Sequence, residues 1–219
     1  MPKITVVDDN KTNGKLNNGW GFSCLVEQGS NKVLFDTGWD GQALLENLEI
    51  LGINPKTIDI LVLSHQHWDH VGGVPHMLHA AGNLKVYVPS SFSPNLKKEI
   101  SIHAEVAEVT NACEIIQGIY SSGELGEKTP EQSLIIKGKS GIFVITGCAH
   151  PGLSPILEVA SSFGKIVGVL GGLHSLDEIQ LLENMKYIAA GHCTRRIEDL
   201  KSLYGNRYTP IYAGYSIVF

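Results

Sequence analysis

The segment Ser64–Gly73 reads SHQHWDHVGG and follows the apolar run IDILVL. It holds three of the nine histidines in the 219-residue chain, together with an aspartate. His65 and His67 are two residues apart, so on an extended segment both point the same way and can hold one metal ion. Asp69 and His70 follow on the turn and can face a second ion. An open coordination position on such an ion lowers the pKa of bound water, so the pattern predicts metal-dependent hydrolysis.

Three later strand-like segments also end in a histidine. GIFVITGCAH ends at His150, KIVGVLGGLH at His174 and KYIAAGH at His192. The carboxyl ends of strands in an α/β layer converge on one edge, so we expect these side chains to join the first motif there. His174 has two interpretations, a metal or substrate contact and a structural hydrogen bond. Cys148 and Cys193 stand beside these histidines, and we interpret them as small packed residues.

The elements that would position these side chains alternate between short strands and amphipathic helices. Strands are predicted at 3–7, 22–28, 32–38, 58–64, 85–89, 141–146, 165–172, 187–191 and 210–219, and helices at 41–52, 74–82, 153–163, 175–185 and 195–205. Residues 105–137, which are broken by glycines and a proline, predict three or four antiparallel strands. Because no repeat or linker interrupts this rhythm, residues 1–219 are predicted to be one α/β domain.

The composition is that of a globular protein, with 43% hydrophobic and 18% charged residues. A net charge of -5 argues against a nucleic-acid or membrane-surface partner, so a small-molecule substrate is expected and the oligomeric state stays open. The start, MPKITVVDDNK, does not fit a signal peptide, and no apolar run is long enough for a membrane span. The four cysteines form no C-x-x-C pair, which favours reduced thiols and a cytoplasmic location.

The motif H-Q-H-W-D-H at His65–His70 matches the H-x-H-x-D-H signature of the metallo-β-lactamase superfamily. The upstream FDTG, which contains Asp36, and the later histidines follow in the order expected of that superfamily. TGCAHPG, GGLH and GHCT resemble more specifically the dihydropterin-methyl-ribofuranosylaminobenzene phosphate synthase-like subfamily. The resemblance runs from Val33 to the final strand. It implies an αββα sandwich with a binuclear metal site at one edge.

The resemblance also implies a ligand set. The first ion would be held by His65, His67 and His150, and the second by Asp69, His70 and His192. Asp36 would brace the histidine loop, and Asp69 would also orient the attacking water. Zinc is the preferred ion, with iron and manganese as alternatives. Many members of the superfamily bridge the two metals with an aspartate, but the corresponding region here reads GGLHSLD, with His174 near that place and Asp177 in a predicted helix. The bridge is therefore expected to be missing.

The leading functional prediction is a hydrolase that uses a metal-bound hydroxide on an anionic, phosphorylated small molecule. HCTRRIEDL supports the anionic substrate, because Thr194 as a helix N-cap and the charge of Arg195 would attract an anion near His192. Solvated arginines on a helix are the competing interpretation. The first alternative function is a transferase that joins a pterin to an arylamine with release of pyrophosphate. The second is a non-catalytic metal or ligand sensor.

Overall fold

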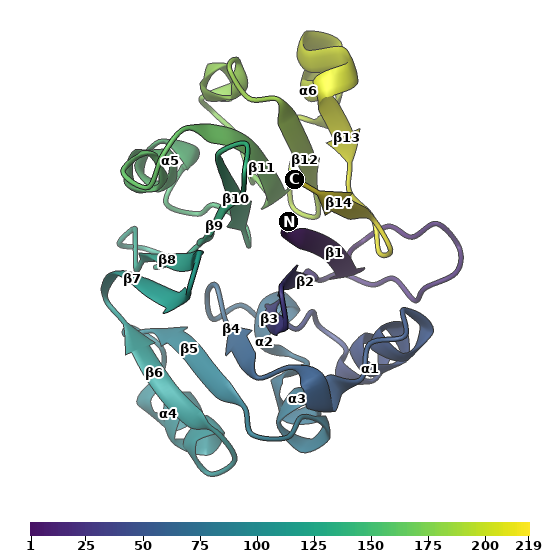
Figure 1. The fold of residues 1–219 in the computed structure, drawn as a ribbon, viewed down its shortest axis with the longest axis vertical. Coiled ribbons are helices and arrows are strands. Elements are labelled where there is room, and N and C mark those ends of the chain that lie inside the picture. The colour runs from purple at the N-terminus through teal and green to yellow at the C-terminus, as the bar shows by residue number, and fades with distance from the viewer.

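Two seven-stranded sheets packed face to face form the middle of the protein, which a computed structural model describes over residues 1–219 (Figure 1). The first sheet has the order β14-β1-β2-β3-β4-β5-β6 and the second the order β13-β12-β11-β10-β9-β8-β7. The first sheet contains β1 (Lys3–Asp8), β2 (Ser23–Gln28), β3 (Asn31–Phe35), β4 (Ile60–Val62), β5 (Lys85–Pro89), β6 (Glu105–Val109) and β14 (Ser216–Val218). The second contains β7 (Asn111–Ile116), β8 (Ile119–Gly123), β9 (Leu134–Lys137), β10 (Ile142–Thr146), β11 (Ile166–Gly172), β12 (Tyr187–Gly191) and β13 (Tyr208–Pro210).

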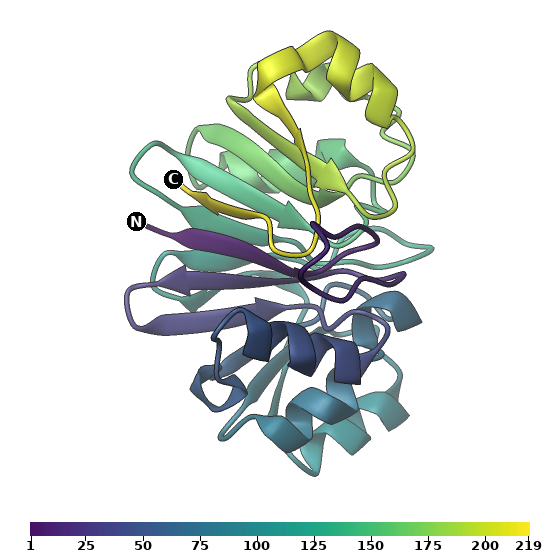
Figure 2. The same ribbon diagram turned by 90° about the vertical axis from the view of Figure 1, so that its right-hand side faces the viewer.

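Helices cover the outer faces of both sheets (Figure 2). The first sheet carries α1 (Gly41–Ile50), α3 (Val74–Ala80) and α4 (Pro94–Ser101), and the second carries α5 (Leu153–Ser161) and α6 (Ile197–Tyr204). Shorter elements are α2 (Trp68–Val71) and the 3₁₀ turns η1 (Pro55–Thr57), η2 (Ile179–Leu182) and η3 (Gly205–Arg207). Three apolar clusters hold the layers together, one between the sheets and one beneath the helices on each side. The predicted αββα sandwich is confirmed.

Local sequence explains why these elements form where they do. Helix α1 begins after Asp40, whose carboxylate accepts hydrogen bonds from two backbone N–H groups of the first turn, and it ends before Gly52, which has a φ of 71°. Strand β10 reads IFVIT and is buried along its whole length, because the other sheet covers one face and α5 the other. No helix combines the length and apolar character needed to cross a membrane.

Two strand predictions differ from the structure. Within residues 105–137, β7, β8 and β9 are antiparallel, but β6 pairs parallel with β5 because α4 returns the chain to the same end of the sheet. The single strand predicted at 210–219 is two strands on different sheets. Strand β13 pairs with β12, whereas β14 pairs with β1, and the chain crosses between them through a turn at Gly214, where φ is 98°.

The helix predicted at 175–185 is wrong except for the single turn η2. The apolar spacing suits a helix, but His174 and Leu176 have φ values of 43° and 49°, in the left-handed region that a right-handed helix cannot contain. Asp177 therefore lies in a turn, where its carboxylate accepts a hydrogen bond from Ser175 at 3.0 Å.

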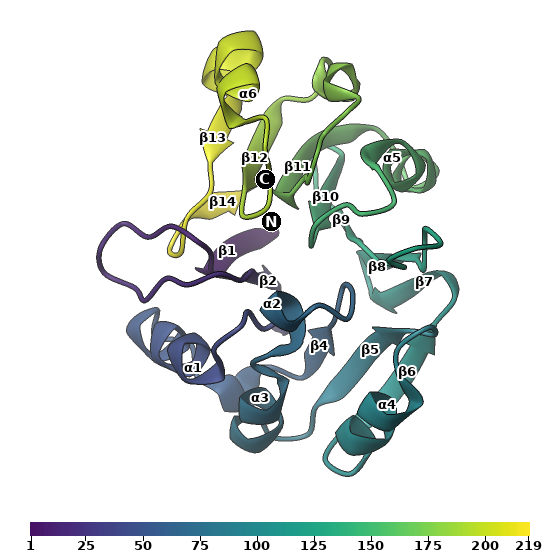
Figure 3. The same ribbon diagram turned by 180° about the vertical axis from the view of Figure 1, so that it is seen from behind.

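The topology brings four strand ends to one edge. Strands β3 to β6 run parallel, as do strands β10 to β13, so β4, β10, β11 and β12 all point their carboxyl ends toward that edge. Figure 3 shows α2 there, between the two halves of the molecule. The segments that carry the predicted ligands follow these four strands.

Candidate metal centre

The loop between β4 and α2 carries the first four predicted ligands, and Asp36 fixes its shape. Asp36 Oδ1 accepts a hydrogen bond from the Ser64 backbone N–H at 2.6 Å, and Oδ2 accepts from Ser64 Oγ at 2.6 Å. The same Oδ2 accepts from His70 Nδ1 at 2.7 Å. One fully buried carboxylate thus joins both ends of the motif and holds His65 and His70 in a fixed relation.

The remaining predicted ligands stand on tight turns after β10 and β12. Ala149, directly before His150, has a φ of 56°, and His192 itself has a φ of 49°. Non-glycine residues with positive φ are uncommon and carry strain. Here the strain turns the chain at the strand end, so that the side chains point back over the sheet edge toward the β4–α2 loop.

His65, His67 and His150 form one group. Their ring centroids lie 4.6 to 4.9 Å apart, and His65 Nε2 lies 3.1 Å from His67 Nδ1. Two imidazole nitrogens bound to one tetrahedral zinc ion lie roughly 3.4 Å apart, from zinc–nitrogen bonds of about 2.1 Å. The observed spacing is therefore that of ligands to a common ion.

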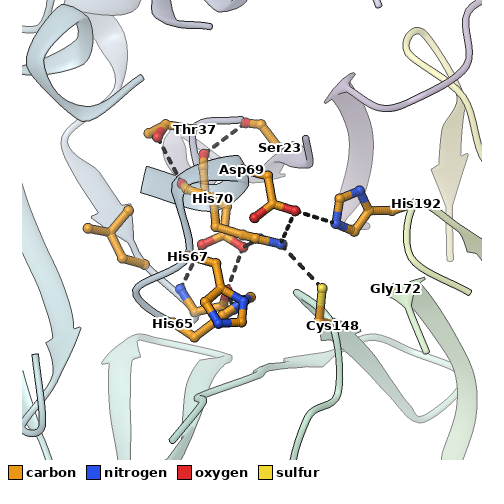
Figure 4. A network of polar contacts seen from close by, with 12 residues as sticks. Ser23, Thr37, His65, His67, Asp69, His70, Cys148, Gly172 and His192 are labelled. Carbon is orange, nitrogen blue, oxygen red and sulfur yellow. Dashed lines mark hydrogen bonds and ion pairs between the residues drawn. The ribbon is translucent and has the colours of Figure 1, made fainter. Parts of the chain in front are cut away.

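Asp69, His70 and His192 form a second group beside the first (Figure 4). Asp69 Oδ2 lies 3.4 Å from His192 Nε2 and 3.8 Å from His70 Nε2. The groups meet at His65 and His70, whose ring centroids are 4.1 Å apart. The structure thus brings together all six side chains predicted as ligands, in the two sets predicted.

The far nitrogen of four of these imidazoles is hydrogen bonded to an acceptor. His65 Nδ1 faces Ser64 Oγ at 2.8 Å, His70 Nδ1 faces Asp36 at 2.7 Å, His150 Nδ1 faces Glu131 Oε2 at 3.0 Å, and His192 Nδ1 faces Asn10 Oδ1 at 3.1 Å. Such partners place the proton on Nδ1 and leave the Nε2 lone pair free for a metal, as is usual for ligating histidines.

Glu131 and Asn10 were not predicted from the sequence. Glu131 is buried and also accepts hydrogen bonds from the backbone N–H groups of Cys148, Ala149 and His150, at 2.9 to 3.0 Å. Burial alone would raise the pKa of Glu131, but the neighbouring His65 and the hydrogen bonds from His150 hold it well below its usual range. Neither residue belongs to a local motif, so only their distant partners show what they do.

The electrostatics of the site suit a divalent cation. Burial lowers the pKa values of His65 and His70 to about 3, so both imidazoles are neutral and keep a free lone pair. Burial works to raise the pKa of Asp69, but contact with His192 and His70 holds it well below its usual range, which keeps the carboxylate charged. His192 Nε2 is buried without a hydrogen-bond partner. A metal ion would satisfy that nitrogen, so the donor set fits one or two divalent transition metals.

Cys148 is placed differently from the expectation of a merely packed residue. Its side chain is buried, but Sγ lies 3.3 Å from His70 Nε2. The same sulfur lies within 4.8 Å of donor atoms in three sets, with His65 and His150, with His70 and His192, and with His174 and Cys193. Cys148 therefore stands among the side chains predicted as ligands.

His174 lies at the rim of the site. Its ring centroid is 4.9 Å from that of His150, and its Nδ1 is buried without a partner. This position is compatible both with a metal or substrate contact and with a structural hydrogen bond, the two interpretations of His174.

The N-cap role predicted for Thr194 is wrong. Thr194 Oγ1 accepts a hydrogen bond from the Leu173 backbone N–H at 2.9 Å, so the hydroxyl ties β11 to the turn after β12. Helix α6 begins three residues later, at Ile197, without a side-chain cap. Arg195 is exposed, and its backbone N–H donates to the His174 carbonyl at 2.9 Å. The Arg195 guanidinium belongs to the segment that directly follows His192, and it has no ion-pair partner.

An apolar groove adjoins the β4–α2 loop. It has a volume of about 540 Å³ and is lined by Trp68, Val71, Leu78, Leu96 and Ile100 together with polar residues that include Gln66. All three tryptophans of the chain are exposed, Trp20 by 59%, Trp39 by 58% and Trp68 by 71%. The Trp20 ring lies 5.5 Å from that of His192. Exposed aromatic rings beside polar donors are typical of a binding surface for a ring-containing ligand.

Comparisons with known proteins show the family and the fold. The family model described as the metallo-beta-lactamase superfamily matches residues 20–162. The chain is 27% identical, over 80% of each chain, to the 7,8-dihydropterin-6-methyl-4-(beta-D-ribofuranosyl)-aminobenzene-5′-phosphate synthase of Methanocaldococcus jannaschii. A solved metal-dependent hydrolase of the beta-lactamase superfamily superposes with a TM-score of 0.83 at 24% identity, over 100% of this chain and 99% of the other. A diphosphatase of the PhnP family superposes with a TM-score of 0.70 at 17% identity, over 100% and 97%.

Proposed function

Because this chain belongs to the metallo-beta-lactamase superfamily, we propose that it is a metal-dependent hydrolase acting on an anionic, phosphorylated small molecule. The strongest support is the set of four imidazoles whose Nδ1 atoms are each held by an acceptor, so that their Nε2 atoms turn toward one centre. One or two divalent ions held there, with zinc preferred and iron or manganese as alternatives, would supply hydroxide near neutral pH by lowering the pKa of bound water.

The protein's own residues would prepare the attack. Asp69 stays deprotonated and has one oxygen directed at His192 and His70, so its carboxylate is available to accept a hydrogen bond from the attacking water and fix its direction. Asp36 and Glu131 hold the imidazole rings and limit their movement during turnover. Asp69 is the residue to which we assign the direct catalytic role.

The substrate would be recognised by charge at one side and by apolar contact at the other. Arg195 is exposed and free of an ion pair, so it can attract an anionic group. The groove next to Trp68 can take an apolar or aromatic portion, since its walls are mainly aliphatic side chains. A phosphorylated molecule with a ring system meets both requirements.

The test is metal loading followed by a substrate panel. Purified protein stripped with a chelator and reloaded with zinc, iron or manganese is assayed on a phosphodiester, a phosphomonoester, a thioester and a lactam. We expect stoichiometric metal and hydrolysis of a phosphate ester that is lost in His65→Ala. The matched control is His76→Ala, which changes an exposed histidine of α3 outside the site. Substoichiometric metal in the reloaded parent would end the hydrolase proposal.

A second candidate is a transferase that joins a pterin to an arylamine with release of pyrophosphate. It is favoured by the similarity to the methanogen synthase over 80% of both chains, and by the exposed tryptophans, on which flat rings can stack. Incubation with a pterin diphosphate and an arylamine phosphate, with detection of pyrophosphate, separates the two candidates. Pyrophosphate release that requires the amine favours the transferase, and release without it favours hydrolysis.

A further inference from the structure

We propose that the Cys148 thiolate is a ligand shared by the two metal positions and takes the place of the missing bridging carboxylate. The proposal rests on the metal binding inferred above. It adds a soft sulfur donor to a site otherwise composed of imidazoles and one carboxylate.

The sulfur lies where the two groups of ligands meet. It is 3.3 Å from His70 Nε2 in the second group and within 4.8 Å of the donor atoms of His65 and His150 in the first. A thiolate sulfur and an imidazole nitrogen bound to one tetrahedral zinc ion lie roughly 3.6 Å apart, from bonds of about 2.3 and 2.1 Å. Small movements within the observed spacing would therefore bring the sulfur into the coordination range of both ions.

An unsatisfied nitrogen faces the same point. The His192 side chain is fully buried and its Nδ1 is occupied by Asn10, whereas its Nε2 makes no hydrogen bond and has the Asp69 carboxylate, a ligand of the same group, 3.4 Å away. His192 Nε2, His70 Nε2 and Cys148 Sγ lie within 4.8 Å of one another. Buried polar atoms without a hydrogen bond are rare in proteins, and a cation bound among these three atoms would accept the free lone pair of His192 Nε2.

None of the nearby carboxylates contacts ligands of both groups. The contacts of Asp69 are with His192 and His70, which both belong to the second group. Both oxygens of Glu131 accept backbone or imidazole hydrogen bonds on the outer side of His150, and Asp36 is similarly engaged by Ser64 and His70. Asp177, the aspartate nearest to the expected bridge in sequence, lies in a turn and accepts from Ser175. A neutral imidazole offers a single lone pair, on its unprotonated nitrogen, and cannot bridge, whereas a thiolate has several lone pairs on one atom.

The end of β11 packs closely against the segment that carries Cys148. A Cβ atom on Gly172 would lie 2.4 Å from the Gly147 carbonyl oxygen and 2.6 Å from Cys193 Sγ. No side chain can therefore enter from this strand end without displacing the segment that carries Cys148. Figure 4 shows Gly172 beside Cys148 with the sulfur directed at His70.

Binding of a metal by Cys148 needs only the loss of the thiol proton and no oxidant or reductant. The S–H bond of Cys148 breaks as sulfur–metal bonds form, the proton passes to solvent, and the sulfur keeps its oxidation state. A metal ion deprotonates a coordinating thiol outright. Thiolate also favours zinc over the harder manganese, so the proposal predicts a zinc preference.

X-ray absorption at the zinc edge tests the proposal directly. We expect a sulfur neighbour at about 2.3 Å in the zinc-loaded parent in addition to nitrogen and oxygen neighbours. Cobalt-loaded protein should show a sulfur-to-cobalt charge-transfer band. Both signals should disappear in Cys148→Ser, and the second equivalent of zinc should bind at least about tenfold more weakly. Cys193→Ser shows whether the sulfur signal comes from the neighbouring thiol instead. Cys113→Ser is the matched control on β7, away from the site.

The outcomes separate this proposal from the proposed function. Two equivalents of zinc with only nitrogen and oxygen neighbours would overturn the role of Cys148 and leave the metalloenzyme intact. A sulfur signal that persists in Cys148→Ser but vanishes in Cys193→Ser would identify Cys193 as the sulfur ligand. That result would also overturn the role of Cys148. Failure of the parent to bind zinc, iron or manganese would overturn both proposals, whereas binding of iron or manganese without zinc would overturn only the role of Cys148. If Cys148→Ser does not fold, the spectrum of the parent still decides, because a missing sulfur shell there refutes the proposal.

Discussion

Replacing Glu131 by glutamine should weaken both folding and metal binding, although it changes only one oxygen to nitrogen. Glu131 accepts four hydrogen bonds while completely buried, three from consecutive backbone N–H groups and one from His150 Nδ1. The amide oxygen of glutamine can keep the two bonds to Cys148 and Ala149. The new NH₂ group then faces the His150 backbone N–H, and two donors cannot pair.

The magnitude follows from these bonds. One buried backbone N–H left unpaired costs about 1–3 kcal/mol, and the loss of charge from the remaining bonds costs about 1 kcal/mol more. We therefore expect the free energy of unfolding of metal-free protein to fall by about 2–4 kcal/mol. The glutamine NH₂ also favours a His150 ring protonated on Nε2, which removes the lone pair aimed at the metal. Loss of such a supporting contact reduces metal affinity by about 10–100-fold.

Two measurements check the prediction. Denaturant unfolding of chelator-treated protein gives the stability, and zinc titration against a competing chelator gives the affinity. Glu127→Gln makes the same chemical change on the exposed part of the same loop and should alter neither. A Glu131→Gln protein with parental stability and parental zinc affinity would refute the role assigned to this carboxylate.

Three further predictions concern single side chains. Asp69→Ala should keep the thermal unfolding transition near that of the parent and lower kcat/KM for the substrate found by at least about a hundredfold; activity within a few-fold would exclude its catalytic role. Burial raises the pKa of Asp8 from 3.8 to about 7, so the folded state keeps a proton that the unfolded chain has lost, and this carboxyl costs stability increasingly as pH rises through that window. Asp8→Asn should therefore stabilise metal-free protein more at pH 8 than at pH 5, by up to about 3 kcal/mol in denaturant unfolding, and an equal effect at both pH values would contradict the assignment. Gly172→Ala should lower the unfolding free energy by about 1–3 kcal/mol because its methyl group would meet the Gly147 carbonyl; parental stability would show that the strand end can adjust.

The parts of the site that could be predicted are those encoded locally. The spacing of His65, His67 and His70 carries its own geometry, since alternate residues of an extended segment share a side. The later histidines were identified because each follows an apolar strand, and parallel strands end at the same edge. The order of these elements predicted one α/β domain, and the αββα arrangement was implied by the resemblance that the motifs carry.

The parts that could not be predicted depend on contacts between distant positions. Glu131 and His150 are 19 residues apart, and Asn10 and His192 are 182 residues apart. Neither pair has a periodicity that reveals it. Cys148 was interpreted as packed because an isolated buried cysteine usually is, and only the fold shows its sulfur among imidazoles. The prediction of a helix at 175–185 failed because helical periodicity does not show a backbone held in left-handed conformations.

Those left-handed residues connect the fold to the function. Five non-glycine residues have positive φ, namely Asp36, Ala149, His174, Leu176 and His192. Each of them is a site residue or lies in a turn that contains or adjoins one. Each such conformation costs about 1–2 kcal/mol. The strain is offset by fixed contacts, among them the Asp36 carboxylate on Ser64 and His70 and the Asn10 side chain on both the ring and the carbonyl of His192. A chain under no functional constraint would relieve this strain with glycine or a longer turn. Its concentration at one edge of the sheets indicates that the backbone conformation serves to aim the side chains that we propose as metal ligands.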